Sequence, residues 1–244
     1  MSSLYLREDL ETATEGALVE LEGAEAKHAV TVNRSRAGDE IRIGNGRGLV
    51  VTGVIDTLEP GRVSVRVSAV TVEDEATPRL VLVQALAKGD RDEMAVQTAT
   101  ELGVSAIVPW AAARSVSRWE GLKKEKGRSR WETIVREASK QSIRSFVPPV
   151  HPIASTAVLE KLAATACVVL LDPTAKERLS DLDVAGETRD VLLVVGPEGG
   201  ISDAELDTLT AAGAVRARLG DTVLRTSSAG PAALAVLNVS LGRW

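Results

Sequence analysis

The sequence predicts an α/β protein in which a small β-barrel precedes a domain built on a parallel β-sheet. Two observations predict this fold class. Residues 17–70 hold short β-rich runs separated by turn formers such as Asn45-Gly46 and Pro60-Gly61, which is typical of a small barrel. After Pro78, apolar strands alternate with helices, the pattern of a parallel sheet covered on both faces.

Length and composition set limits on this fold. A chain of 244 residues is long enough for two domains with separate cores. We place the barrel at residues 1–73, an acidic linker at 74–78 and the sheet domain at 79–244. No apolar run approaches 18 residues and the N-terminus lacks signal-peptide features, so we expect a cytoplasmic protein without a membrane span. A single cysteine excludes an internal disulfide, and with only two histidines a metal site is not expected.

The individual elements follow in order along the chain. Barrel strands are expected at residues 17–23, 39–46, 49–57 and 62–70. Strands of the sheet are expected at 79–86 and 105–110, and within 166–173, 191–200 and 214–221. Helices are expected at 92–102, at 129–146 before Pro148-Pro149, after the capping box of Ser202 and Glu205, and at 229–241. Ligands of parallel sheets bind at the carboxyl ends of the strands.

The segment from Arg114 to Arg144 is basic, although the net charge of the chain is −5. It holds ten Lys or Arg residues and four Glu residues, a local charge of +6. On the expected helix, Arg136, Lys140 and Arg144 share one face at four-residue spacing. Such a face suits a phosphate backbone. From charge alone, an ordinary solvated helix face is equally compatible.

The run VLLVVGPEGGISDAEL at 191–206 joins an apolar strand to a capped helix through a glycine-rich turn. Phosphate-binding corners have this shape, but the turn fits neither the P-loop nor the GxGxxG pattern. It has no lysine, and Glu198 would repel a pyrophosphate. It therefore favours a phosphate-free nucleoside ligand such as S-adenosylmethionine, with an ordinary strand–helix turn as the alternative. A second glycine turn precedes Arg225, which is suited to bond a base carbonyl or a phosphate.

Four segments occur in a specific order: ALAKGDRDEMAVQTATELGVSAIVPW (85–110), RW…EASKQSIR…VPPV (130–150), LLVVGPEGGISDAEL (192–206) and LGDTVLRT (219–226). Together they resemble the RsmE-type 16S ribosomal RNA (uracil-N3)-methyltransferases of the SPOUT superfamily, over nearly the whole chain. The resemblance implies a PUA-like barrel that helps hold RNA and a SPOUT-type parallel sheet with a C-terminal trefoil knot. It also implies a homodimer.

The resemblance further implies S-adenosyl-L-methionine as cofactor and 16S rRNA, naked or in the small ribosomal subunit, as substrate. The product would be N3-methyluridine near the 3′ end of 16S rRNA. Matched residue by residue, the cofactor pocket would be formed by Leu171, Val195, Gly196, Pro197, Glu198, Gly199, Gly200, Leu219, Gly220, Val223 and Leu224.

Arg225 is the expected catalytic residue, because a guanidinium can stabilise negative charge on a uracil oxygen as N3 loses its proton. Ser227 stands where the family commonly has a glutamate, so no general base is assigned. Glu198 is assigned to the cofactor in preference to a role as base. RNA contacts are expected from Arg7, His28, Arg34, Arg36, Lys88, Arg91 and Arg114.

Two other functions are compatible with these residues. One is a SPOUT methyltransferase that acts on another base or on a ribose 2′-hydroxyl. The other is a non-catalytic RNA-binding factor with the same fold, which the serine at position 227 would favour.

Overall fold

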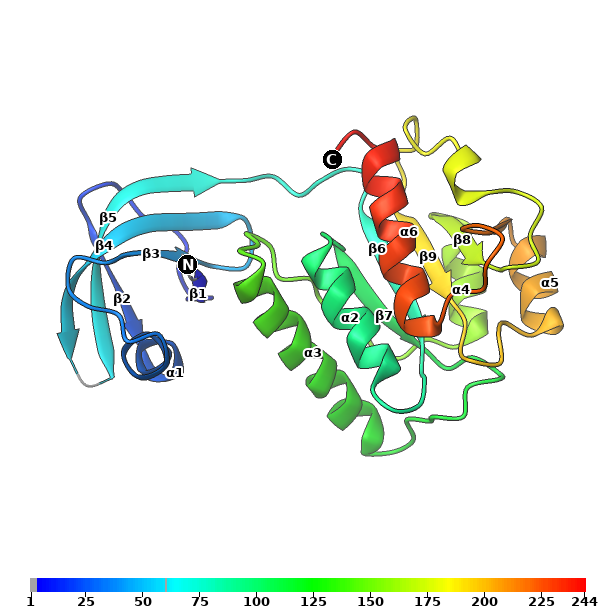
Figure 1. The fold of residues 1–244 in the computed structure, drawn as a ribbon, viewed down its shortest axis with the longest axis horizontal. Helices are drawn as coiled ribbons and strands as arrows, with labels where there is room; N and C mark the ends of the chain where they lie inside the picture. The colour runs from blue at the N-terminus through cyan, green and yellow to red at the C-terminus, as the bar shows by residue number, and fades with distance from the viewer. Residues whose placement is uncertain (1–3, 60) are drawn as a thin grey trace. The chain divides into compact units, whose positions relative to one another are not determined.

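The computed structural model describes residues 4–59 and 61–244, whose contacts divide into two compact units. The first unit comprises the chain up to Glu75 together with Ser139–Val147. The second comprises Ala76–Ala138 and Pro148–Trp244. Each unit has an apolar core of its own. Their elements are labelled in Figure 1.

A five-stranded sheet forms the first unit. In pairing order its strands are β1 (Leu4–Leu6), β3 (Glu40–Gly44), β4 (Leu49–Glu59), β5 (Arg62–Val72) and β2 (Leu18–Glu22). β1 runs parallel to β3, and the other pairs are antiparallel. The four expected strands are confirmed, whereas β1 and the helical segment of α1 (Gly23–Lys27) and η1 (His28–Val32) were not anticipated.

Five parallel strands form the sheet of the second unit. Their order is β10 (Val215–Ala217), β8 (Cys167–Leu171), β9 (Val191–Val195), β6 (Leu80–Ala85) and β7 (Ala106–Trp110). β6, β7 and β9 are buried along their whole length, as strands covered on both faces should be. The predicted α/β class with a parallel sheet is confirmed.

Helices cover both faces of this sheet (Figure 1). On one face, α2 (Arg91–Glu101) packs against α6 (Thr226–Ser240), and both contact β6. On the other, α4 (Thr156–Leu162) and α5 (Asp203–Ala211) share a core with alternate side chains of β6, β8 and β9. In the part of the chain that the structure describes, no helix is both long and apolar enough to cross a membrane.

The C-terminal helix α6 lies between several segments that are distant in sequence. It contacts β6 and β9 of the sheet and also η2 (Leu179–Asp181), which belongs to the connection between β8 and β9. The trefoil knot that the family resemblance implies stays a prediction.

The long helix α3 spans Lys123–Gln141, so the expected helix at 129–146 is wrong at both ends. The helix ends in a Schellman motif, in which Arg144 N donates to Ser139 O at 2.9 Å and Ile143 N donates to Lys140 O at 3.4 Å. Ile143 occupies the left-handed position of this motif, with φ of 57°. Glycine usually takes that position, and a β-branched residue rarely does. The helix therefore ends without a recognisable sequence signal.

Because α3 ends at Gln141, the expected basic face of Arg136, Lys140 and Arg144 does not form. Arg144 lies beyond the helix and is half-buried, where burial lowers its pKa to about 10. Lys140 is only 6% exposed, and its Nζ lies 3.1 Å from Oε1 of Glu25 within the first unit. The three residues therefore do not form a solvent-facing basic face on one helix.

Candidate functional site

The carboxyl ends of β8, β9 and β10 surround a cavity of about 570 Å³ in the second unit. Pockets for molecules of nucleoside size or larger commonly measure about 300–1,000 Å³. Arg225, the catalytic candidate, lines the cavity, and so does every residue assigned to the cofactor: Leu171, Val195, Gly196, Pro197, Glu198, Gly199, Gly200, Leu219, Gly220, Val223 and Leu224. The structure thus brings two separate motifs to one site.

A tight turn after β9 forms one wall of the cavity. Gly200 N donates to Pro197 O at 2.8 Å, and Gly200 has a φ of 72°. At Gly196, a Cβ atom would lie 2.8 Å from Ile201 Cγ1 and 2.9 Å from Ile201 N. A side chain at position 196 would therefore force the backbone of the turn apart.

A buried chain of hydrogen bonds ties this turn to the sheet and to α6. Thr226 Oγ1 donates to Gly196 O, and Gln84 Nε2 donates to Thr226 Oγ1, both at 2.9 Å. Gln84 is fully buried and Thr226 is 6% exposed. Buried polar groups are costly unless they are bonded, so these contacts specify where α6 begins. Gln84 is not among the expected site residues, although a lone glutamine in an apolar strand is a signal that the sequence offers.

Glu198 is held by the loop that follows β6. Its Oε1 accepts hydrogen bonds from Lys88 N at 3.0 Å and from Arg91 Nη1 at 2.9 Å. Partial burial opposes its ionisation, but hydrogen bonds from backbone N–H groups and from Arg91 outweigh it and lower the pKa of Glu198. The carboxylate is therefore ionised at neutral pH and is occupied in holding residues 88–91.

We expect Glu198→Ala to increase amide hydrogen exchange at Lys88 and Arg91, with Glu198→Gln in between because it keeps an acceptor for Lys88 N. Because the pKa of Glu198 is lowered in the folded protein, its stabilising effect is present above the ordinary pKa of 4.5 and is lost as the pH falls through the lowered value. The exchange rates of the wild type should therefore approach those of Glu198→Ala only in acid. Equal exchange rates in the wild type and in Glu198→Ala at pH 7 would refute this role.

A second carboxylate, Asp172, joins β10 to the loop after β8. Its Oδ2 accepts from Arg216 Nε at 2.7 Å and its Oδ1 accepts from Thr174 N at 2.9 Å. Burial opposes ionisation of this 7% exposed residue, but the hydrogen bonds from Thr174 and Arg216 prevail and lower the pKa of Asp172. Asp172 and Thr174 line the cavity and were not among the expected site residues.

Arg225 is exposed and immediately precedes α6. Among residues 4–59 and 61–244, its guanidinium donates no hydrogen bond and pairs with no carboxylate, so it is available to a ligand. The two preceding residues are apolar yet exposed, Val223 at 77% and Leu224 at 39%. Ser227, in the first turn of α6, has no carboxylate or imidazole among its hydrogen-bond partners in the described structure.

Three of the residues expected to contact RNA lie at this edge of the sheet, Lys88 and Arg114 in loops and Arg91 at the start of α2. Arg91 and Arg114 line the cavity, and Lys88 lies beside Glu198. Arg114 Nη1 donates to Gly199 O and Ile201 O, both at 3.2 Å. Arg91 and Arg114 therefore also support the loops that form the cavity.

The remaining RNA candidates lie in the first unit. Arg7 donates to Glu20 O at 3.1 Å and pairs with Asp9 at 3.2 Å. Arg34 and Arg36 are exposed in the loop after η1, and Arg34 has a φ of 51°.

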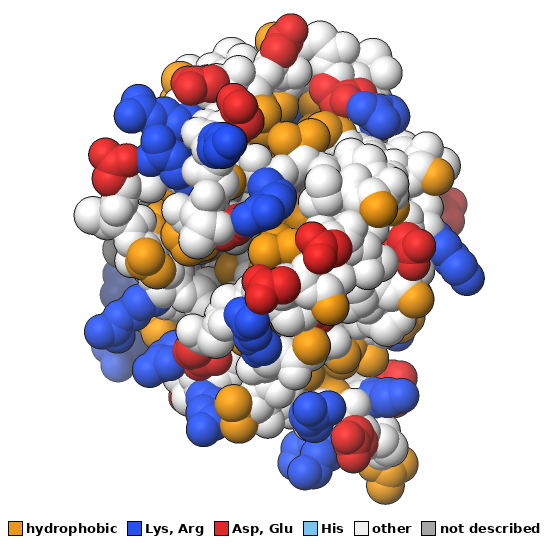
Figure 2. Space-filling model, turned by 90° about the vertical axis from the view of Figure 1, so that its right-hand side faces the viewer, with side chains coloured by type: hydrophobic (Ala, Val, Ile, Leu, Met, Phe, Trp, Pro, Cys, Tyr) orange, Lys and Arg blue, Asp and Glu red, His pale blue; other side chains and the backbone are white. Residues whose placement is uncertain are grey.

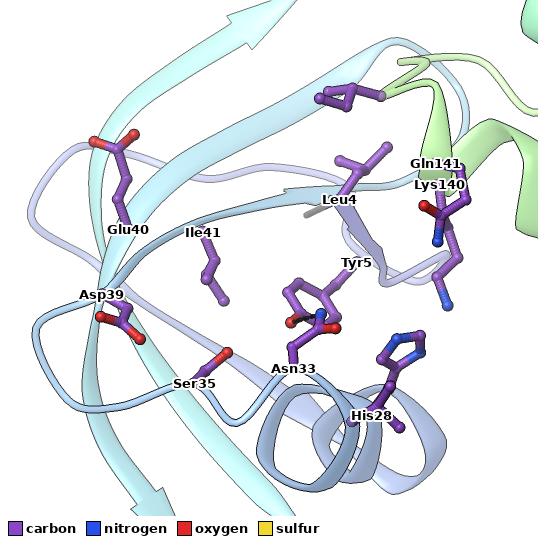
Figure 3. A pocket seen from close by; sticks show the side chains of 12 residues that line it. Leu4, Tyr5, His28, Asn33, Ser35, Asp39, Glu40, Ile41, Lys140 and Gln141 are labelled. Carbon is purple, nitrogen blue, oxygen red and sulfur yellow. Dashed lines mark hydrogen bonds between the residues drawn. The ribbon is translucent and has the colours of Figure 1, made fainter. Parts of the chain in front are cut away.

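His28 lines a separate cavity of about 850 Å³ in the first unit (Figure 3). Its ring meets Tyr5 edge-on, with centroids 6.1 Å apart, and Asn33 Nδ2 donates to Tyr5 Oη at 2.7 Å. Asp39 and Glu40 line the same cavity, and its one lysine, Lys140, is paired with Glu25, so its charge does not favour phosphate.

Surface charge does not single out a ligand site on the face drawn in Figure 2. On the face drawn in Figure 2, cationic and anionic side chains are interspersed around exposed apolar ones. Within the described ranges, no group of three or more His, Cys, Asp or Glu side chains is arranged to hold a metal ion.

Known proteins are similar to this chain in both sequence and fold. Residues 74–238 match the RNA methyltransferase domain family, and residues 21–68 match the RNA methyltransferase PUA domain family. The chain is 42% identical to ribosomal RNA small subunit methyltransferase E of Mycobacterium bovis, over 94% of this chain and 89% of that protein. It is 33% identical to the Bacillus subtilis protein of the same name, over 88% of each chain.

A solved structure extends this similarity to three dimensions. It is the crystal structure of a ribosomal RNA small subunit methyltransferase E from Neisseria gonorrhoeae bound to S-adenosyl methionine, which is 28% identical with a TM-score of 0.84 over 98% of both chains. The family inferred from the four sequence segments is thereby confirmed. The chain belongs to the RNA methyltransferase family that includes ribosomal RNA small subunit methyltransferase E.

Proposed function

We propose that this protein methylates small-subunit ribosomal RNA with S-adenosyl-L-methionine, at N3 of a uridine near the 3′ end of 16S rRNA. The observation that carries the proposal is the single cavity that gathers the GPEGG turn, the Leu219–Leu224 segment and Arg225. The names of the relatives and the cofactor bound to the Neisseria structure support the same activity.

The cavity residues fit this cofactor. Leu171, Val195 and Leu219 supply apolar walls for a purine ring, and the backbone of the glycine turns supplies polar groups for a nucleoside. When bound, S-adenosylmethionine supplies an electrophilic methyl group. The protein must then hold the two reactants in line, which is where most of the acceleration of such a displacement arises.

The residues at the cavity divide the remaining work. Arg225 has no partner of its own in the described structure, and we assign it to stabilise negative charge on uracil as N3 is deprotonated. Glu198, whose pKa is lowered and whose Oε1 is already bonded, shapes the cofactor loop. Ser227 has no basic partner, so we infer that the N3 proton passes to water.

Two measurements test the function. Calorimetry should show S-adenosylmethionine binding to the folded protein, and absence of binding would refute the proposed methyltransferase activity. Mass mapping of 16S rRNA from a deletion strain should show loss of N3-methyluridine near the 3′ end. Persistence of that mark would refute the site assignment, and loss of a different base or ribose methyl group would establish the alternative substrate.

We infer that the first unit contributes to RNA binding through Arg34 and Arg36, with Arg7 and His28 as further contacts. Both arginines are exposed in one loop, where phosphates can reach them. The double variant Arg34→Gln/Arg36→Gln should weaken binding to rRNA about ten-fold or more and leave S-adenosylmethionine affinity unchanged. Unchanged RNA affinity in a filter-binding titration would remove this loop from the interface.

We also infer a homodimer that covers Val223 and Leu224. These side chains expose apolar surface beside the cavity, and a partner subunit would remove it from water. Sedimentation should give about twice the 25.7 kDa mass of one chain, and Val223→Asp should give the monomer. The matched control is Val158→Asp, on the 45% exposed Val158 of α4. A wild-type protein of monomer mass would contradict the dimer.

A further inference from the structure

A second cavity, of about 270 Å³, lies at the same edge of the sheet in the second unit. Leu86 follows β6, Ala111 and Ala112 follow β7, and residues 153–155 precede α4. The connection between β7 and α3 supplies the rest of its wall: Ser115, Ser117, Arg118, Trp119 and Glu120, joined by Lys124 at the start of α3. None of these residues lines the cofactor cavity.

The two cavities are close to each other. β6 pairs with both β9 and β7, and neighbouring strands lie about 4.8 Å apart, so β7 is about 10 Å from β9. Arg114 lines the cofactor cavity and the next residue, Ser115, lines the second one. Stacked nucleotides rise by about 3.4 Å each, so an RNA strand with its target base at the first cavity reaches the second within a few nucleotides.

Ser115 has an unused hydroxyl group. The residue is 5% exposed, and its Oγ has no hydrogen-bond partner among the described residues. A buried hydroxyl without a partner costs about 1–3 kcal/mol, and such groups are normally bonded. The Oγ atom itself has almost no accessible surface, so a ligand atom in the cavity that Ser115 lines would supply the missing bond once the Ser115 side chain rotates toward it.

The walls suit a planar, largely apolar ring. Trp119 packs edge-on against Trp131 with centroids 5.1 Å apart, and a Cβ at Gly127 would lie 2.3 Å from the Trp119 ring. These neighbours hold the indole in place, and the apolar Leu86 and Ile153 line the same cavity. Because 270 Å³ is below the usual range for drug-sized ligands, about 300–1,000 Å³, the cavity suits one base rather than two.

Unpaired positive charge completes the site. Arg118 and Lys124 are exposed, and neither pairs with a carboxylate in the described structure. Other cations of the same segment are engaged, since Arg128 pairs with Glu132 at 3.0 Å and Arg130 with Glu93 at 2.9 Å. Glu120 also lines the cavity, which leaves a local charge of +1 and an acceptor for a base amino group.

We propose that this second cavity binds one unpaired nucleotide of the RNA substrate, close in sequence to the methylated base. The base occupies the slot beside Trp119, Ser115 Oγ bonds its edge, and Arg118 and Lys124 bind the adjoining phosphates. This inference rests on the proposed function and extends it, because a flanking base read in this way would set the sequence context of methylation.

The salt dependence of RNA binding tests the phosphate contacts. Each lost phosphate contact lowers the slope of log K against log salt by about 1. We expect this reduction, with several-fold weaker binding to deproteinised small-subunit rRNA, in Arg118→Gln and in Lys124→Gln. The control is Lys161→Gln, which removes the same charge from an exposed lysine near the end of α4, at the opposite edge of the sheet.

Ser115→Ala tests recognition of the base. Since Ser115 Oγ has no partner within the described protein and its burial is costly, the variant should keep or raise its melting temperature while RNA binds about three- to ten-fold more weakly. Ser129→Ala, an exposed serine of α3 outside the cavity, is the control. S-adenosylmethionine affinity should be unchanged in every variant, which separates this cavity from the first.

The outcomes distinguish this inference from the proposed function. If the wild type methylates rRNA but Arg118→Gln and Lys124→Gln behave like Lys161→Gln, the second cavity is not an RNA site and the proposed function stands. Effects seen only with intact small subunits, and not with deproteinised rRNA, would replace the nucleotide by a ribosomal protein. If the wild type neither binds nor methylates RNA, both proposals fail together.

Discussion

Arg225→Ala should lower the rate of methyl transfer about 10²- to 10³-fold while S-adenosylmethionine affinity changes by less than about two-fold. Removal of one donor that stabilises developing negative charge typically costs this much in turnover. The side chain lines the cavity and bonds no other described residue, so its loss should leave the loops that form the cavity in place. Single-turnover kinetics with rRNA and calorimetry with the cofactor measure the two quantities.

Arg225→Lys provides the matched control. Lysine keeps the charge but loses the planar fork with which arginine bonds a carbonyl, so we expect an intermediate rate. If the alanine variant loses cofactor affinity as strongly as turnover, Arg225 acts in binding and its assignment to the chemical step is wrong.

Gly196→Ala should abolish measurable cofactor binding, with affinity at least about 100-fold lower. The added Cβ would lie 2.9 Å from a backbone atom, Ile201 N, so the turn itself must move. Movement of Gly196 O would break its hydrogen bond with Thr226 and leave a buried polar group unsatisfied. Overpacking of this kind also destabilises a fold by about 1–3 kcal/mol, which thermal unfolding would detect.

Gly199→Ala, in the same turn, is the control for this prediction. Its Cβ would meet Arg114 Cβ at 3.3 Å, a tight contact that a shift of a few tenths of an ångström in the exposed loop of Arg114 relieves. We expect less than a ten-fold loss of cofactor affinity. Equal losses at positions 196 and 199 would show that the clash with Ile201 does not govern the turn.

Much of the architecture was predictable because its signals are local. Apolar runs bounded by turn formers located the parallel strands, and the capping box at Ser202 located the start of α5. The motif residues assigned to one ligand do line one cavity, although their individual roles stay predictions.

Other features depend on contacts that sequence patterns do not reveal. Gln84 and Thr226 are 142 residues apart, so neither residue alone indicated the hydrogen bond beneath the cavity. The end of α3 depends on Ile143 adopting a conformation that its residue type disfavours. The prediction of a basic face is wrong for the same reason, because the helix ends before Arg144.

The dependence of the cavity on Thr226 has a consequence for how the protein is made. The GPEGG turn accepts a hydrogen bond from Thr226, the first residue of α6, so its final geometry requires a residue that is synthesised 30 positions after Gly196. Chain elongation proceeds at about 5–20 residues per second, and earlier segments begin to fold while the rest is still being translated. We therefore expect a nascent chain that ends before residue 226 to have folded strands but no cofactor affinity. The cofactor cavity would in this way stay unformed until α6 has been synthesised and has packed against the sheet.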